Sequence, residues 1–242
     1  MHLTPVLLRR REVWLPTWRG VLLLSALAVI VGAVLCLKAY DLLAPQQPAR
    51  GPNGDGARTL VVEGWLEADD LQQAIARVRA SHYARVLTTG GPVINWPGGG
   101  QWSSYAARAA DYLRANGVTD IPVIAVEAPA SAQERTYLSA VMVREWAQHA
   151  GVRLEAIDLY SAGVHARRSW IAYRMALGDE VEVGVLAAAP TEFDPRRWWT
   201  SSAGAKSTLG EAVSVLWTKC CFWPAPRGSH EERWAVPAVA PP

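Results

Sequence analysis

One run of apolar residues limits how this chain can fold. From Gly20 to Leu37 the sequence GVLLLSALAVIVGAVLCL holds no charged residue. At a rise of about 1.5 Å per residue, a helix of this length just spans a hydrocarbon core that is roughly 30 Å thick. The run is apolar on every side, whereas a helix in a soluble core is usually amphipathic. The sequence therefore predicts one transmembrane anchor over residues 20–37.

The charges beside this run predict its orientation. Four arginines precede it, at positions 9, 10, 11 and 19, and only Lys38 and Arg50 follow it closely. The positive-inside rule then keeps residues 1–19 in the cytoplasm and places the rest of the chain outside it. The rival interpretation is a cleaved signal peptide, which needs a small-x-small cleavage site. The sequence after the run, LKAYDLLAP, offers none.

Composition excludes several classes of protein. Hydrophobic residues make up 50% of the 242 residues and charged residues 19%, so the chain can bury a core. The net charge is only +2, whereas a nucleic-acid-binding domain usually carries a basic excess, so we expect no nucleic-acid partner. The three cysteines, Cys36, Cys220 and Cys221, are too few for a disulfide framework. Because the last two are adjacent, we expect them to behave as small apolar residues rather than to pair.

The rest of the chain divides by its pattern into three parts. Residues 38–58 are rich in Pro, Gly and Gln and predict a flexible linker. Residues 59–190 alternate short apolar runs with stretches of helical periodicity, which predicts an α/β domain. Its mostly parallel, five-stranded sheet has strands near 59–65, 85–91, 121–127, 153–161 and 180–189.

Residues 191–242 form a Trp-rich C-terminal extension. Its apolar residues predict a helix over 207–223. One interpretation is that the extension completes the core, which we favour because large exposed apolar patches are rare. The other is that this helix lies on the membrane or on a partner protein.

Ligands of parallel sheets bind outside the carboxyl ends of the strands, which selects the candidate site. The expected strand ends and the helix starts that follow them contribute Glu63, Gly64, Thr89, Gly90, Gly91, Arg135, Thr136, Ser161, His165 and Arg168. Glu63 is either half of an ion pair with Arg135 or Arg168, or an acid/base catalyst, or a group that binds a hydroxyl or a cation. His165 and Arg168 share one face at a helix start, where an anion would bind. The alternative for this pair is a solvated helix start.

Other catalytic machinery is absent from the sequence. It contains no GxSxG elbow, no GxxxxGK[ST] loop and no GxGxxG motif. The histidines show no metal-ligand spacing, so we expect no metal site, and nothing in the sequence names a cofactor.

Several short motifs occur in a fixed order along the chain. They are VVEGW (61–65), LTTGG (87–91), ERTYLSA (134–140) and LYSAGVHARRS (159–169). In this order they resemble the DUF218 family, the ElyC/SanA/YdcF group of bacterial envelope proteins, over about residues 59–190. The segment WWTSSAGAKSTLGEAV (198–213) looks like the tail of a YdcF-like subgroup. In one departure, Trp65 and Leu66 stand where many members have a Gly-rich, Arg-containing segment.

The resemblance implies a Rossmann-like three-layer sandwich and a role in peptidoglycan or barrier maintenance. The family pattern places its polar residues at Glu63, Gly90, Gly91, Thr136 and His165. One branch of the family is associated with a nucleotide-like ligand such as S-adenosylmethionine.

Residues and resemblance together predict a single-pass protein of a bacterial inner membrane with a periplasmic domain. The expected partners are the lipid bilayer through residues 20–37, an anionic envelope precursor and a membrane protein. The first functional hypothesis is binding of a nucleotide- or lipid-linked anionic ligand. The second is a hydrolase or transferase that uses Glu63 or His165 as acid/base. The third is a non-catalytic interaction module that uses the Trp-rich tail.

Overall fold

The structure is a computed structural model that describes residues 16–54, 56–93, 101–131 and 134–233. The chain divides into two compact units, Met1–Lys38 and Ala39–Pro242. The arginines at positions 9–11 and Trp234 lie outside the described residues.

The first long helix contains the expected membrane span. Helix α1 runs from Trp18 to Leu43 and has a mean hydropathy of 2.8 over its most apolar window. It is the one helix of the described chain that is long and apolar enough to cross a membrane. Its last turn, Ala39–Leu43, belongs to the second unit, where Leu43 is buried.

The second unit is built on one six-stranded sheet in the order β1-β6-β5-β2-β3-β4. The strands are β1 Gln46–Gln47, β2 Thr59–Glu63, β3 Arg85–Gly90, β4 Val123–Glu127, β5 Ala156–Ala162 and β6 Glu182–Ala188. Strands β2 to β6 are parallel and match the five expected runs, with β5 ending one residue beyond its expected run, at Ala162. The expectation of five strands was one too few, because β1 pairs antiparallel with the edge of β6. Its two glutamines carry no apolar signal that could have predicted a strand.

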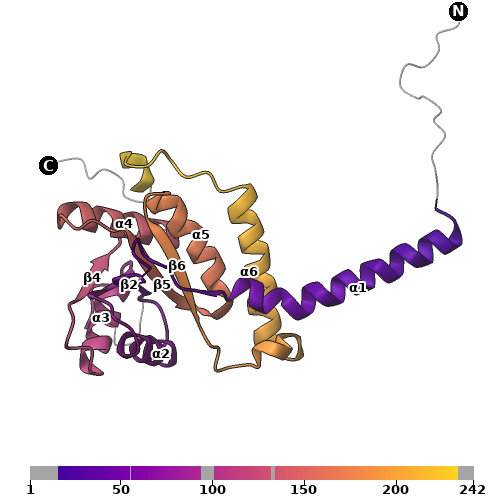
Figure 1. Ribbon diagram of the computed structural model, residues 1–242, viewed down its shortest axis with the longest axis horizontal. Coiled ribbons are helices and arrows are strands. Elements are labelled where there is room, and N and C mark those ends of the chain that lie inside the picture. Colours follow the sequence, from indigo (N-terminus) through magenta and orange to yellow (C-terminus); the bar gives the residue numbers. More distant parts are fainter. Residues whose placement is uncertain (1–15, 55, 94–100, 132–133, 234–242) are drawn as a thin grey trace, which may run out of the picture. The chain divides into compact units, whose positions relative to one another are not determined.

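Helices cover both faces of this sheet. They are α2 Ala68–Arg79, α3 Tyr105–Ala115, α4 Arg135–His149, α5 Ala166–Leu177 and α6 Ser202–Cys220, with short 3₁₀ turns η1 Gly163–His165, η2 Pro195–Thr200 and η3 His230–Arg233. Helices α2 and α3 pack on one face, and α4 and α5 pack on the other (Figure 1). Helix α6 lies beside α5, farther from the sheet.

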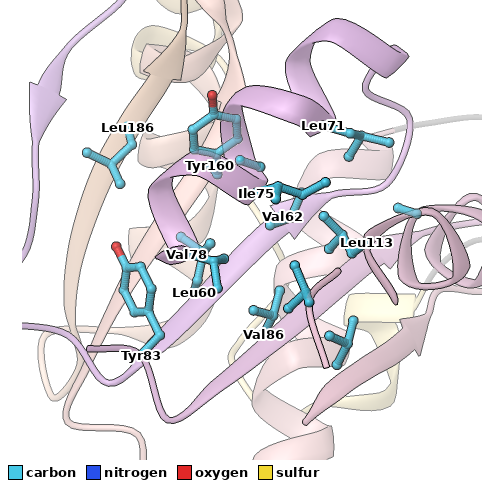
Figure 2. Packing of buried hydrophobic residues seen from close by; sticks show 14 of the residues in the cluster. Leu60, Val62, Leu71, Ile75, Val78, Tyr83, Val86, Leu113, Tyr160 and Leu186 are labelled. Carbon is cyan, nitrogen blue, oxygen red and sulfur yellow. The ribbon is translucent and has the colours of Figure 1, made fainter. Parts of the chain in front are cut away.

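Strand β2 shows why the sheet is buried on both sides. Leu60 and Val62 point toward α2, where they meet Ile75 and Val78 (Figure 2). Val61 belongs to the cluster on the opposite face. Alternate side chains of a strand point to opposite faces, so a strand covered on both faces reads as a continuous apolar run.

The segment after α1 differs from the expected flexible linker, because it is held against the edge of the sheet. Ala49 N donates to the buried carboxylate of Asp158 at 2.7 Å. The next two backbone amides, of Arg50 and Gly51, donate to Glu182 at 2.9 and 3.0 Å. Gly184 of β6 makes this close approach feasible, since a Cβ there would collide with Ala49 N.

The C-terminal extension is partly core and partly surface. Trp198 and Phe222 are buried, and the Phe222 ring lies 5.4 Å from that of Tyr137 in α4. Trp199, Trp217 and Trp223 are exposed. The chain then returns over α4, where buried Glu232 accepts a hydrogen bond from Tyr137 at 2.8 Å and pairs with Arg144. Cys220 and Cys221 form a disulfide, contrary to the expectation that they stay unpaired.

Candidate functional site

A cavity of about 1430 Å³ opens at the carboxyl ends of the strands. It lies where the order of the sheet reverses, because β2 has β3 on one side and β5 on the other. Such switch points are where ligands of parallel sheets bind. Eight of the ten expected site residues line this cavity: Glu63, Thr89, Gly90, Gly91, Arg135, Thr136, His165 and Arg168. Gly64 and Ser161 lie directly behind the lining.

Glu63 presents a buried carboxylate to the cavity at the end of β2. Ser161 donates a hydrogen bond to Oε2, and Ser169 donates to Oε1 at 2.9 Å. These hydroxyl partners stand where the sequence analysis had considered Arg135 or Arg168. Burial, together with the charge of Glu63, raises the pKa of neighbouring Tyr173. That tyrosine hydroxyl lies 3.2 Å from the Thr89 hydroxyl, so a polar network supports the floor of the cavity.

The two glycines at the ends of β2 and β3 let the start of α3 approach closely. A Cβ on Gly64 would lie 2.5 Å from the Tyr105 carbonyl oxygen and 2.6 Å from that of Thr89. Gly90 has a φ of 153°, and a Cβ there would lie 2.7 Å from the Tyr105 Cβ. Gly64 therefore serves packing rather than ligand contact, which is why it does not line the cavity.

His165 and Arg168 converge on a third residue, Glu211 of α6. His165 Nδ1 lies 3.0 Å from Glu211 Oε1. Arg168 donates through Nε to Oε2 at 2.9 Å and through Nη2 to Oε1 at 3.1 Å. Burial would raise the pKa of Glu211, but the hydrogen bonds from His165 and Arg168 outweigh it and hold the pKa at about 2.

Two side chains of opposite charge contact the same ring nitrogen of His165. Glu211, which is ionised at neutral pH, lies 3.0 Å from Nδ1 through Oε1, and Arg168 Nη2 lies 3.0 Å from the same nitrogen. The carboxylate only accepts a hydrogen bond and the guanidinium only donates one, so the two contacts fit opposite tautomers of the ring. Nε2 is buried and has no hydrogen-bond partner within the described part of the chain. The Trp65 ring packs edge-on against the imidazole, at 4.9 Å between centroids.

Sequence reasoning missed Glu211. The helix in that segment was predicted from its apolar residues alone, and Glu211 is not one of them. Only the resemblance of residues 198–213 to a family tail covers the position, and it gives Glu211 no role. No local pattern joins Glu211 to His165, because the two lie 46 positions apart and meet only when α6 packs beside α5.

The start of α4 forms another wall of the cavity. Glu134 precedes the helix with φ 39° and ψ 44°, the one non-glycine residue with positive φ in the described ranges. Such a conformation costs on the order of 1–3 kcal/mol and persists where surrounding structure enforces it. It leads directly into Arg135 and Thr136, whose backbone amides open the helix at its positive end.

A second wall is acidic. Glu67, Asp69 and Asp70 come from the start of α2, and Glu192 follows β6. Burial, together with the charges of the other three carboxylates, raises the pKa of Asp70 despite a hydrogen bond from the backbone at Glu67. In the part of the chain that the structure describes, no group of three His, Cys, Asp or Glu residues is arranged to hold a metal ion.

Some cationic side chains of the cavity are held by hydrogen bonds within the protein, and others are exposed to a ligand. Arg168 is engaged by Glu211, and Arg108 donates to the carbonyl oxygens of Gly64 and Leu66 at 3.0 and 2.6 Å. Arg135 and Lys206 are exposed residues of the lining. The cavity thus offers cationic groups, ionised carboxylates and hydroxyls together.

Comparisons with models of known protein families, with curated proteins and with solved structures found no significant match.

Proposed function

We propose that this chain is a membrane-anchored envelope protein whose α/β domain binds an anionic ligand, nucleotide-linked or lipid-linked, in the cavity. The observation that carries the proposal is the convergence of Glu63, the Thr89–Gly91 turn, Arg135–Thr136 and His165–Arg168 on one cavity of about 1430 Å³. That volume exceeds the range of about 300–1,000 Å³ typical of small-molecule sites, so it accommodates an extended ligand.

The mixed lining supports a ligand with two chemical parts. A phosphate group suits Arg135, Lys206 and the positive end of α4. The carboxylates of Glu63 and of the acidic wall suit sugar hydroxyls, because ionised carboxylates only accept hydrogen bonds and hydroxyls donate them. A phosphate-linked sugar satisfies both parts, whereas a ligand with many phosphates would be repelled by the acidic wall.

Two finer assignments belong to the same proposal. From one edge, the parallel strands follow the order third, second, first, fourth and fifth, which supports a Rossmann-like classification. The ordered motifs from VVEGW to LYSAGVHARRS support membership of the DUF218 family. With that membership comes a role in peptidoglycan or barrier maintenance at the periplasmic face of a bacterial inner membrane.

The test is ligand binding by the full-length protein in phospholipid nanodiscs. The probes are UDP-N-acetylglucosamine, a polyprenyl phosphate and S-adenosylmethionine, each followed by thermal unfolding. A probe at a hundred times its Kd stabilises the folded state by about 2.7 kcal/mol. At roughly 2–4 °C per kcal/mol, that raises Tm by about 5–10 °C.

The matched variants are Arg135→Ala in the cavity and Arg153→Ala, whose side chain is 88% exposed just before β5. We expect Arg135→Ala to remove the rise in Tm and Arg153→Ala to preserve it. The proposal is wrong if no probe raises Tm, or if both variants weaken binding equally.

A second candidate function, an enzyme, rests on the unpartnered Nε2 of His165. This candidate requires the tautomer in which Nδ1 donates to Glu211, because Nε2 then has a lone pair that can accept a proton. In hydrolysis of a phosphoanhydride, Nε2 would accept a proton from a water molecule. The water oxygen bonds to phosphorus at the same time, and the bridging oxygen leaves with the other phosphate. Glu63 is less suited to this step, since hydroxyls engage both of its oxygens.

³¹P NMR of the full-length protein with UDP-N-acetylglucosamine tests this candidate. We expect UMP to be released, and His165→Gln to slow its release at least 100-fold at a saturating concentration of the probe. Turnover that survives His165→Gln, or no turnover by the wild-type protein, leaves binding alone.

A further inference from the structure

Helix α6 presents three distinct faces. Gly204, Thr208, Val215 and Thr218 are buried in the domain. Lys206, Ser207, Gly210, Glu211 and Ser214 line the cavity. The third face consists of Leu209, Val213, Leu216 and Trp217, which we call the α6 stripe. These side chains are 58%, 67%, 67% and 46% exposed.

The α6 stripe is continuous along the helix. Its members are spaced by four, three and one positions, which places them on one side over two turns. Trp223, which is 83% exposed, follows shortly after the end of the helix. Single exposed apolar residues are common, but a contiguous group of large ones marks a surface that contacts something apolar.

The chain itself indicates what lies near this surface. Leu43, in the last turn of α1, is buried in one cluster with Val215 of α6, and Tyr40 and Ala212 pack against that cluster. Arg167 of α5 donates to the Leu42 carbonyl oxygen at 2.8 Å. Leu37, the last residue of the apolar run, precedes buried Leu43 by six positions. Even a fully extended chain therefore keeps the end of the run within about 22 Å of this cluster.

We propose that the α6 stripe rests on the lipid bilayer that α1 crosses. This inference builds on the membrane anchoring in the proposed function. The composition favours lipid over a second copy of the chain, because Trp217, Trp223 and Lys219 join the aliphatic residues. Amphipathic aromatic and basic side chains are typical of helices that lie in a membrane interface.

Contact of the α6 stripe with lipid limits which class of ligand can reach the cavity. Glu211 and Lys206 stand on the same helix as the stripe, and an α-helix with its side chains is only about 10–12 Å across. The cavity then opens beside the lipid headgroups, so a lipid-linked phosphate in the bilayer binds it more tightly than a soluble nucleotide does.

Photocrosslinking in the full-length protein tests the contact. p-Benzoylphenylalanine replaces one residue at a time in nanodiscs of phosphatidylethanolamine and phosphatidylglycerol. The tested position is Val213, and the surface control is Arg153. We expect at least ten times more lipid adduct at Val213 than at Arg153 by mass spectrometry. Equal adducts, or a crosslinked dimer in place of lipid, overturn the inference.

A crosslinker at a third position tests membrane anchoring by α1 independently of the contact made by α6. Ile30 lies in the apolar run of α1. Adducts at Ile30 without adducts at Val213 refute only the α6 contact, whereas no adducts at Ile30 refute the anchoring as well.

The substrate class has its own test. Leu216→Glu places a charge on the stripe without touching the cavity lining. We expect it to weaken binding of polyprenyl phosphate in nanodiscs at least tenfold and to leave UDP-N-acetylglucosamine unaffected. Equal effects on both probes, or no effect on either, contradict a lipid-linked ligand.

Discussion

At the scale of single residues, Glu211 organises one side of the cavity. Both of its oxygens accept hydrogen bonds from Arg168, and Oε1 also lies 3.0 Å from His165 Nδ1, so three side chains from α5, η1 and α6 form one cluster. Each hydrogen bond to a charged group contributes about 1.5–3 kcal/mol. Removal of the charge therefore affects stability as well as the site.

Glu211→Gln should lower the free energy of unfolding at pH 7 by about 2 kcal/mol. The pKa of Glu211 is depressed from its ordinary 4.5 to about 2 in the folded protein. Its contribution is therefore complete above the ordinary value and lost as the pH falls from 4.5 toward 2. Urea unfolding of the full-length protein across this range should show a flatter pH dependence for the variant.

Glu155→Gln is the control, because that carboxylate is 49% exposed and pairs only loosely with Arg153 at 3.6 Å. It should change the free energy of unfolding by less than about 0.5 kcal/mol. An unchanged pH profile for Glu211→Gln would mean that its ion pair does not stabilise the fold.

At the scale of elements, Asp158 of β5 holds the segment after α1 on the sheet. Its buried carboxylate accepts from Ala49 N at 2.7 Å and from the Tyr83 hydroxyl at 2.6 Å. Both donors would be left unsatisfied without it, at about 1–3 kcal/mol each. Asp158 therefore holds the polar segment 46–51 on the sheet, together with Glu182.

Asp158→Ala should lower the free energy of unfolding by about 3 kcal/mol and loosen residues 46–51. Trypsin cleavage after Arg50, which is exposed, measures that loosening in the full-length protein. Tyr83→Phe is the control, since it removes one hydrogen bond but keeps the contact with Ala49. If Asp158→Ala leaves Arg50 as resistant as in the wild type, the segment is held by other contacts.

At the scale of the whole molecule, the end of the described chain is bound to α4. Glu232 is buried and pairs with Arg144, and it also accepts from the Gly228 amide at 2.6 Å. Contacts between residues far apart in the sequence therefore contribute to the free energy of unfolding of the domain.

Glu232→Ala should lower the free energy of unfolding by about 3–5 kcal/mol, because it leaves a mostly buried arginine without its partner. At roughly 2–4 °C per kcal/mol, the fall in Tm is about 10 °C. Glu231→Ala, at an exposed neighbour, should change Tm by less than about 2 °C. Scanning calorimetry of the two variants compares them directly, and equal values would show that the C-terminal return does not stabilise the domain.

We predict the orientation of the whole chain from its N-terminal arginines. Reporter enzymes fused after about residue 50 should be active only outside the cytoplasm. Replacing Arg9, Arg10 and Arg11 by alanine should move part of the population to the opposite orientation. Cytoplasmic activity of the unaltered fusion would overturn both the topology and the localisation.

The sequence by itself determined the features that depend on local pattern. The apolar run from Gly20 to Leu37 and the five parallel strands are readable because burial imposes a continuous apolar composition on them. The convergence of eight of the ten expected site residues on one cavity was readable too, since the ends of parallel strands must meet at one edge.

Only the tertiary structure decided the features that depend on polar contacts between distant segments. Glu211 contacts His165, Ser161 and Ser169 bind Glu63, and Gln46–Gln47 forms a strand, through contacts across 46 to 140 positions. A hydrogen bond needs one donor and one acceptor at about 3 Å, and it leaves no periodic trace in the sequence around either of them. Apolar burial repeats along the chain and can be predicted, whereas these pairings are specified only by the fold that brings them together.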